Sequence, residues 1–172
     1  MSRQAEIEAC WESCLRSLPV NTQAPTRYFD ASAFGSEGEN DLADELAELV
    51  VQGIKTATAS VLNYYQEGNH PIERAGDRCI VLMSTGRPRC IIEMTEIRIL
   101  PFGEVDEAFA AEYGEGERTL QWWREHLGAY YARECASRGW TFSEEIPLVC
   151  KRFRVAFHCP AADVTTMRPI EQ

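Results

Sequence analysis

The sequence lacks most of the features that mark metal-binding, membrane-spanning and exported proteins. It has only three histidines in 172 residues, none with a metal-ligating neighbour at a zinc spacing, and no Cys-x-x-Cys pair. No window approaches the roughly 18 consecutive apolar residues of a membrane helix, and the first residues lack the apolar core of a signal peptide. We therefore expect a cytoplasmic protein with no metal, no cofactor and no membrane partner.

Positive charge is also scarce, and lysine is nearly absent. The formal net charge is −10 at pH 7, whereas proteins that hold long nucleic acids usually present a basic face. Any nucleic-acid role must therefore rest on a local pocket or on a ligand as small as a nucleoside. Of the 17 basic residues only Lys55 and Lys151 are lysines. This preference for arginine over lysine draws attention to both lysines, although genome composition would explain the preference equally well.

What the chain does contain is typical of one globular domain. A length of 172 residues with 45% hydrophobic residues is enough to bury a core without disulfide bonds. The seven cysteines are an odd number, and several lie in apolar runs where a free thiol behaves as a small hydrophobe. We therefore expect structural thiols. We place a single domain at residues 1–159, with an extra N-terminal helix at about 3–18 and a C-terminal tail at 160–172; no pattern indicates the oligomeric state.

Apolar periodicity and turn residues predict the order of the elements. Helical spacing indicates helices at 3–18, from Asn40 to a stop at Gly53, at 106–113 and at 118–137. Runs rich in β-branched and apolar residues predict strands at 56–65, 78–83, 89–99 and 148–158, whereas 19–38 is predicted as a long loop. Because the strands are grouped and the helices lie outside them, we expect an α+β fold with one mostly antiparallel sheet or barrel.

Lys55 and Thr58 are the first candidates for chemistry. They are three residues apart just past the predicted helix end, so one more helical turn would bring their side chains together. Where a lysine lies beside a hydroxyl, the hydroxyl can act as the nucleophile and the lysine as its base, if burial lowers the lysine pKa. The alternative is that Lys55 only complements the helix dipole and the threonines begin a strand.

Lys151 is the second candidate. In the strand predicted at 148–158, period-2 alternation places it on the apolar face with Phe153, whereas Arg152 and Arg154 face water. A lysine on an inner face needs an anionic partner or an opening to solvent. It therefore either lines the same pocket as Lys55 or extends its ammonium to the surface at the start of the strand.

Some acidic and aromatic residues are further candidates. Glu115 lies between glycines, which allow the backbone to approach a ligand closely, and Glu93 is surrounded by apolar residues in its strand. Most acidic clusters are only solvated faces. Trp123 and its neighbours on the helix at 118–137 are most simply core residues, although an aromatic ring there could stack on a base.

These residues lie in a pattern that resembles the ASCH-domain family of the PUA-like superfamily, in its longer bacterial branch. The segment Gly53-x-Lys55-x-x-Thr58 resembles the family signature G-x-K-x-x-T-x-R. Ser60 occupies the position of the signature arginine, and Tyr113 stands at a position where the family pattern suggests glutamate. The resemblance covers about residues 30–158. The matching segments are 43–46, 53–60, 76–77, 88–95, 102–105, 114–118 with Trp123, and 150–153.

The resemblance implies a PUA-like, mostly antiparallel β-barrel flanked by helices, with a cleft beside the lysine motif and a link to RNA or modified nucleosides. Short relatives resemble amidohydrolases that deacylate N4-acetylcytidine with a threonine, a lysine and a glutamate, which carry over to Thr58, Lys55 and Glu115. A longer relative is a ribonuclease acting on single-stranded RNA. We assign substrate binding to the following residues: Ser60, Glu93, Arg118, Trp123 and Lys151.

Three functions remain open from the sequence. The first is hydrolysis of the amide of an N4-acylated cytidine, which suits an acidic protein because the ligand is small and neutral. The second is metal-independent cleavage of single-stranded RNA, with Lys55, Lys151 and Arg118 gripping the phosphate. The third is a non-catalytic module that binds RNA or a nucleotide in the cleft.

Overall fold

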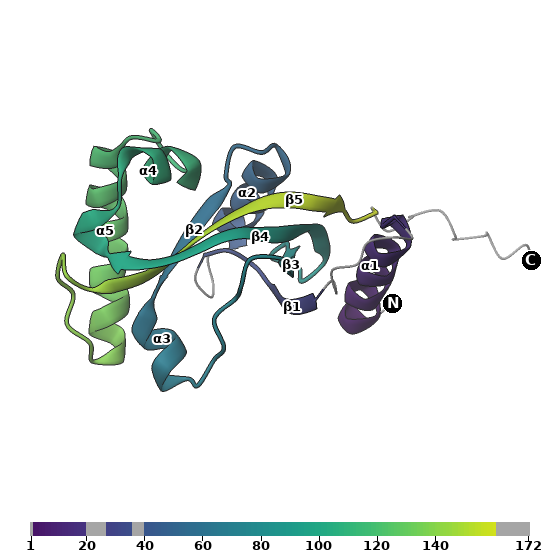
Figure 1. Ribbon diagram of the computed structural model, residues 1–172, viewed down its shortest axis with the longest axis horizontal. Helices are drawn as coiled ribbons and strands as arrows, with labels where there is room; N and C mark the ends of the chain where they lie inside the picture. The colour runs from purple at the N-terminus through teal and green to yellow at the C-terminus, as the bar shows by residue number, and fades with distance from the viewer. Residues whose placement is uncertain (1, 20–26, 36–39, 161–172) are drawn as a thin grey trace, which may run out of the picture.

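The structure is a computed structural model that describes residues 2–19, 27–35 and 40–160. Parts of the predicted loop, at 20–26 and 36–39, and the predicted tail from 161 onward lie outside the described residues. The described chain forms a five-stranded sheet with helices grouped around it (Figure 1). The predicted α+β class is therefore confirmed.

The sheet is mostly antiparallel and has the order β1-β3-β4-β5-β2. Among the strands of the described residues, only the pair formed by β1 and β3 is parallel. The two longest strands, β4 and β5, form the middle of the molecule, and α4 and α5 lie at one end of them while α1 lies at the other (Figure 1). The strands are β1 (Arg27–Ser32), β2 (Ala57–Val61), β3 (Asp77–Leu82), β4 (Pro88–Pro101) and β5 (Pro147–His158). The helices are α1 (Arg3–Ser17), α2 (Asn40–Val51), α3 (Leu62–Glu67), α4 (Glu107–Tyr113) and α5 (Leu120–Arg138), with a 3-10 turn at Phe102–Glu104.

The expectation of a barrel needs one correction, because the sheet is not closed. Within the described residues β1 and β2 are the two edge strands and do not pair with each other. Instead, residues of both edges line a common cavity. The sheet is therefore open between β1 and β2, where a closed barrel would have these strands paired. The candidate site lies at this opening.

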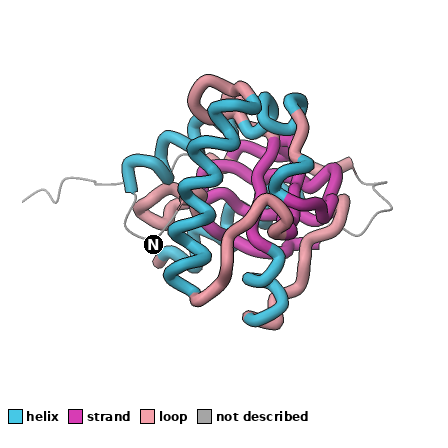
Figure 2. The backbone as a smooth tube through the Cα atoms, turned by 90° about the vertical axis from the view of Figure 1, so that its left-hand side faces the viewer, coloured by secondary structure: helices cyan, strands magenta, loops and turns pink. Residues whose placement is uncertain are grey.

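The helix α5 fixes the edge strand β2 against the sheet. Thr119 caps the helix, since its hydroxyl accepts a hydrogen bond from the Trp122 backbone N–H at 3.1 Å. The apolar side of α5, which includes Trp123, packs on the buried alanines of β2. Seen from this end of the molecule, the helices cover the strands behind them (Figure 2). The buried Tyr131 hydroxyl also donates to the Ala59 carbonyl at 3.0 Å, which holds β2 in place.

Two predicted elements differ from the structure. Part of the predicted loop at 19–38 is the strand β1, which pairs in parallel with β3 from Arg27↔Asp77 to Ser32↔Val81. The predicted strand at 56–65 ends at Val61, where the chain turns into α3. The Thr, Val and Tyr residues of this segment favour a strand locally, but Tyr65 is buried on a helix instead.

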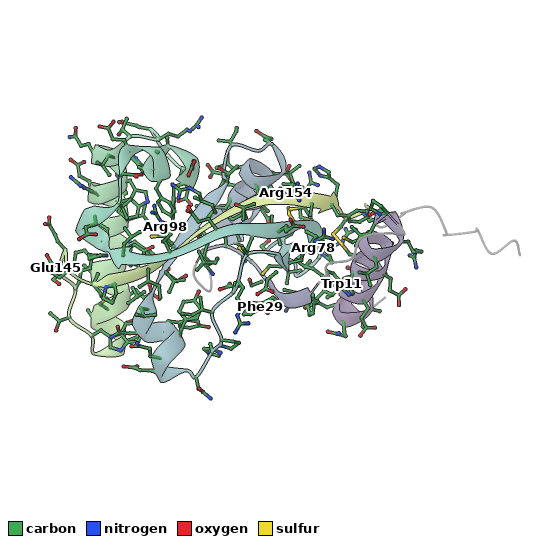
Figure 3. All side chains as sticks on the ribbon, viewed as in Figure 1. Trp11, Phe29, Arg78, Arg98, Glu145 and Arg154 are labelled. Carbon is green, nitrogen blue, oxygen red and sulfur yellow. A yellow bond between two sulfur atoms is a disulfide. The ribbon has the colours of Figure 1, made fainter. Side chains whose placement is uncertain are left out.

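The N-terminal helix α1 corrects the expectation that all cysteines are free thiols. Cys10 of α1 forms a disulfide with Cys159, 149 residues later, just after β5 (yellow in Figure 3). The helix buries Ile7 and Cys14 against Ile80 of the sheet. The other five cysteines of the chain are free and buried, as expected. In the part of the chain that the structure describes, no helix is long and apolar enough to cross a membrane.

Candidate active site

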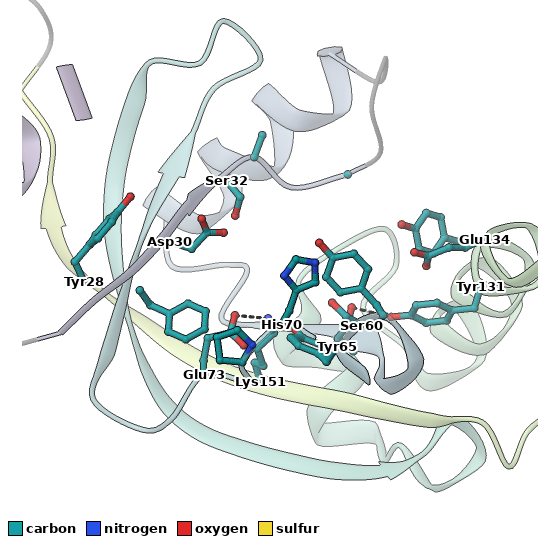
Figure 4. Close-up of a pocket in the computed structure, with 17 residues that line it drawn as sticks. Tyr28, Asp30, Ser32, Ser60, Tyr65, His70, Glu73, Tyr131, Glu134 and Lys151 are labelled. Carbon is teal, nitrogen blue, oxygen red and sulfur yellow. Dashed lines mark hydrogen bonds and ion pairs between the residues drawn. The ribbon is translucent and has the colours of Figure 1, made fainter. Parts of the chain in front are cut away.

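The open side of the sheet contains a cleft with two adjoining parts. The larger cavity, of about 700 Å³, is lined by β1, β2, α3, α5 and Glu73, and we call it the Glu73 pocket (Figure 4). The smaller one, of about 460 Å³, is lined by Thr58 and Glu115 among others, and we call it the Thr58 pocket. Both are lined by Ser60, Tyr130 and Lys151, so they are neighbouring compartments of one cleft.

Lys55 lies behind two residues that line the Thr58 pocket, Tyr113 and Glu115, and contacts both of them. The helix α2 stops before Lys55 because Gly53 adopts a φ of +71°, a left-handed conformation that glycine tolerates best. The Lys55 side chain is completely buried. Its Nζ donates to Glu115 Oε1 at 2.6 Å and to the Tyr113 carbonyl at 3.0 Å, and it lies 3.7 Å from the centre of the Tyr113 ring.

The segment that carries Glu115 reaches Lys55 because of Gly114. This residue has a φ of +76°, and a Cβ at its position would lie 2.5 Å from both Ile54 O and Lys55 Cα. Any side chain there would therefore push the segment away from Lys55. The sequence-based argument that glycines next to Glu115 allow close approach thus has its physical basis at this contact.

Burial lowers the pKa of Lys55 below its ordinary value of 10.5, and the charge and hydrogen bond of Glu115 only partly oppose this effect. A neutral amine is therefore more accessible at Lys55 than at an exposed lysine. Burial also raises the pKa of Tyr113, whose phenol interacts with the Thr58 hydroxyl. Tyr113 thus contacts both Lys55 and Thr58 and remains protonated at neutral pH.

Thr58 reaches the cleft from a strand and not from a continued helix. The further helical turn that would have brought Lys55 and Thr58 together is absent, because α2 ends at Val51 and Thr58 lies on β2, within the segment predicted as a strand at 56–65. On β2, Thr58 pairs with Lys151 and Ser60 pairs with Val149 of β5. Because strand neighbours two apart share a face, Thr58 and Ser60 both face the cleft, where both contribute to its lining.

Lys151 has the anionic partner that its position demands. Its Nζ donates to Glu73 Oε1 at 2.7 Å and to the Tyr65 hydroxyl at 2.9 Å. Burial alone would lower the pKa of Lys151, but Tyr65 and Glu73 outweigh this effect and raise it above 10.5. The two lysines of the chain are thus both buried beside a carboxylate, yet their pKa values are shifted in opposite directions.

The structure separates the other predicted site residues. Glu93 lies outside both pockets and forms ion pairs with Arg78 at 2.7 Å and Arg154 at 2.8 Å. Arg118 is exposed, also outside the lining, and donates to the Ala111 carbonyl at 3.1 Å. Trp123 is fully buried in the core.

Sequence reasoning missed the two cleft residues that bind Lys151, namely Tyr65 and Glu73, whereas Trp122 is one of the neighbours of Trp123 that it considered as a ring able to stack on a base. Trp122 lines the Thr58 pocket and stacks on His126 with 4.3 Å between the ring centres. The need of Lys151 for an anionic partner predicts a carboxylate, but nothing in the sequence selects Glu73 among 27 acidic residues. Tyr65 was placed in a strand, so its contact with Lys151 could not be anticipated.

The charged residues of the Glu73 pocket are mainly acidic. Asp30, Glu73 and Glu134 line it, whereas Lys151 is its one lysine or arginine among the described residues. In Figure 4, Asp30 on β1 and Glu134 on α5 lie on opposite sides of the cavity. No group of three or more histidine, cysteine or acidic side chains in the described ranges is placed to hold a metal ion.

The open, mostly antiparallel sheet with flanking helices and a cleft at its edge is a PUA-like fold. The chain belongs to the ASCH domain family, whose profile matches residues 30–156. It is similar to an ASCH domain from Lactobacillus crispatus JV V101, with 30% identity, 90% of this chain and 96% of that chain covered, and a TM-score of 0.83. Protein EF3133 from Enterococcus faecalis V583 is also 30% identical, with 90% of each chain covered and a TM-score of 0.78. None of the curated proteins matches the chain. The family is generally associated with RNA.

Proposed function

We propose that this protein is an amidohydrolase that removes the acyl group from N4-acetylcytidine or a closely related modified nucleoside. One observation carries the proposal: a fully buried lysine with a lowered pKa contacts a glutamate that lines the same pocket as a threonine. This is the combination of groups that attack on an amide requires, namely a hydroxyl nucleophile, a base and a proton carrier.

In the proposed reaction the Thr58 hydroxyl attacks the acyl carbonyl and forms an ester as the C–N bond breaks. Glu115 both lines the pocket and contacts Lys55 Nζ at 2.6 Å, so it passes the hydroxyl proton to the neutral amine of Lys55. The same proton returns through Glu115 to the leaving N4 amine. Water then hydrolyses the ester to acetate and restores Thr58.

The charges of the cleft favour a neutral nucleoside over an RNA strand. A ribonuclease that grips phosphate with Lys55, Lys151 and Arg118 would need the positive charges of these three residues to be free in the cleft. Each lysine is already paired with a carboxylate, and Arg118 lies outside the lining of both pockets. The acidic walls of the Glu73 pocket would also repel a phosphate.

The direct test is release of cytidine from N4-acetylcytidine by the wild-type protein and by two variants. Thr58→Val keeps the shape of the side chain without its hydroxyl, and Lys55→Met keeps a similar length without its amine. We expect each to lower kcat at least about 100-fold. The matched control is Thr56→Val, because Thr56 lies two positions away and its hydroxyl is directed to the Glu112 carbonyl.

The proposal is rejected if the folded wild-type protein releases no cytidine, or if Thr58→Val is as active as the wild type. Cleavage of a labelled single strand in EDTA, abolished by Lys55→Met, would instead support the ribonuclease. A ligand that raises the melting temperature without turnover would support a binding module.

A further inference from the structure

The buried group formed by Lys151, Glu73 and Tyr65 has no role in the proposed proton transfers, although it lies in the cleft. All three residues are buried and line the Glu73 pocket, on whose floor a dashed line in Figure 4 joins Glu73 to Lys151. The second carboxylate oxygen, Glu73 Oε2, is buried and has no hydrogen-bond partner among the described residues. A buried ion pair with an unsatisfied oxygen weakens a fold, so stability alone does not account for this group.

The ammonium of Lys151 has one N–H to spare. An ammonium carries three N–H donors, and within the described part of the chain two of them are used, by Glu73 at 2.7 Å and by Tyr65 at 2.9 Å. Lys151 lines both pockets. It also pairs directly with Thr58 across β2 and β5. A donor is therefore available close to the proposed nucleophile, where the two pockets meet.

The charge around this donor selects the kind of ligand atom that it can bind. The negative charge of Glu73 neutralises the positive charge of Lys151, and Asp30 and Glu134 add negative charge to the walls. An anion such as phosphate would therefore be repelled from the pocket. An uncharged carbonyl oxygen would accept the free N–H without bringing charge into the cleft.

We propose that Lys151, positioned by Glu73 and Tyr65, is a pyrimidine-binding residue that donates its remaining N–H to the 2-oxo group of the base. The inference rests on the proposed function, because the acyl group on N4 must lie beside Thr58. The 2-oxo group is at the other end of the hydrogen-bonding edge of cytosine from N4. A base with its acyl group in the Thr58 pocket thus directs this oxygen toward Lys151 and the Glu73 pocket.

The test is binding of unmodified nucleosides, which needs no turnover. Cytidine and uridine both carry the 2-oxo group, whereas adenosine has no carbonyl. The variant is the double substitution Lys151→Met with Glu73→Leu, which removes the whole ion pair and leaves no buried charge alone. Titration calorimetry should show cytidine and uridine binding at least tenfold more weakly than to the wild type, with adenosine changed by less than twofold.

Two further variants separate the donor from general effects. Tyr65→Phe removes one positioning hydrogen bond and should raise KM for N4-acetylcytidine while leaving kcat unchanged. The matched control, Arg133→Met, removes another cation that lines the Thr58 pocket and should leave the ratio of cytidine to adenosine affinity unchanged.

The inference is wrong if the folded double variant binds cytidine as tightly as the wild type, or if cytidine and adenosine affinities fall together. It is also wrong if the wild type binds no pyrimidine nucleoside at millimolar concentration. The failures are distinguishable. Binding of cytidine and uridine that depends on Lys151, without hydrolysis of N4-acetylcytidine, would overturn only the proposed function. Hydrolysis with an unchanged KM in the double variant would overturn only this inference.

Discussion

Replacing Glu115 by glutamine should make the stability of the protein depend strongly on pH. Lys55 is completely buried, and the Glu115 side chain that contacts it is only 18% exposed. Removing one partner of such a buried pair typically costs about 3 to 5 kcal/mol in the free energy of unfolding, since the remaining charge is left uncompensated. We expect a loss of this size for Glu115→Gln near neutral pH.

The loss should shrink as the pH rises, because Lys55 can give up its proton. The pKa of Lys55 is lowered by burial in the folded protein, so the unfolded chain binds more protons at this site. Stability therefore rises with pH between the folded pKa and the unfolded value of about 10.4, at up to about 1.4 kcal/mol per pH unit. Without the charge of Glu115 the pKa of Lys55 in the folded protein falls further, so the pH range over which stability rises begins at a lower pH. The curves of the variant and the wild type should thus converge near pH 10.

Urea denaturation at several pH values from 7 to 10 measures both curves. Glu117→Gln is the matched control, because Glu117 is exposed two positions away and its substitution changes the net charge equally. The control should follow the wild type to within about 0.5 kcal/mol, as surface substitutions generally do. Parallel curves for Glu115→Gln and the wild type would refute the view that Glu115 compensates a buried charge on Lys55.

Three further predictions concern the surroundings of the site and its pH dependence. Gly114→Ala should destabilise the protein by at least about 1 kcal/mol more than Gly139→Ala in urea titrations, since both positions have a positive φ but only Gly114 faces backbone atoms at 2.5 Å; equal losses would argue against the close contact. Reduction of the disulfide between Cys10 and Cys159 should lower the free energy of unfolding by up to about 5 kcal/mol, because it closes a loop of 149 residues; calorimetry with and without reductant measures this, and an unchanged melting temperature would contradict it. Finally, kcat for N4-acetylcytidine should rise with pH to a plateau as Lys55 loses its proton below pH 10.5, and a rate that falls over this range would exclude Lys55 as the base.

Local patterns were sufficient to predict most of the elements. The apolar stripes of α1, α2 and α5 end at proline or glycine. The alternation of residues in β5 placed Lys151 on the inner face of the sheet, where Lys151 is indeed paired with a carboxylate. These features depend on neighbours a few residues apart, which a single sequence displays directly.

Contacts between distant segments could not be predicted in the same way. The strand β1 forms by parallel pairing with β3, about 50 residues further on, and nothing local distinguishes it from a loop. The same holds for the disulfide between Cys10 and Cys159 and for the choice of Glu73 as partner of Lys151. The opening between β1 and β2 depends on how the whole sheet curves, so the family resemblance suggested a barrel where the structure has a cleft.

The two proposals give the two lysines of the chain different tasks, Lys55 as a base and Lys151 as a permanent donor. Because Lys55 and Lys151 are the only lysines, a protein labelled at lysine Cε should give two side-chain resonances in an NMR titration with pH, assigned with Lys55→Met. We predict that Lys55 titrates below 10.5 and Lys151 above it. If the two lysines titrate together near 10.5, or if Lys55 titrates above Lys151, this division of tasks is wrong.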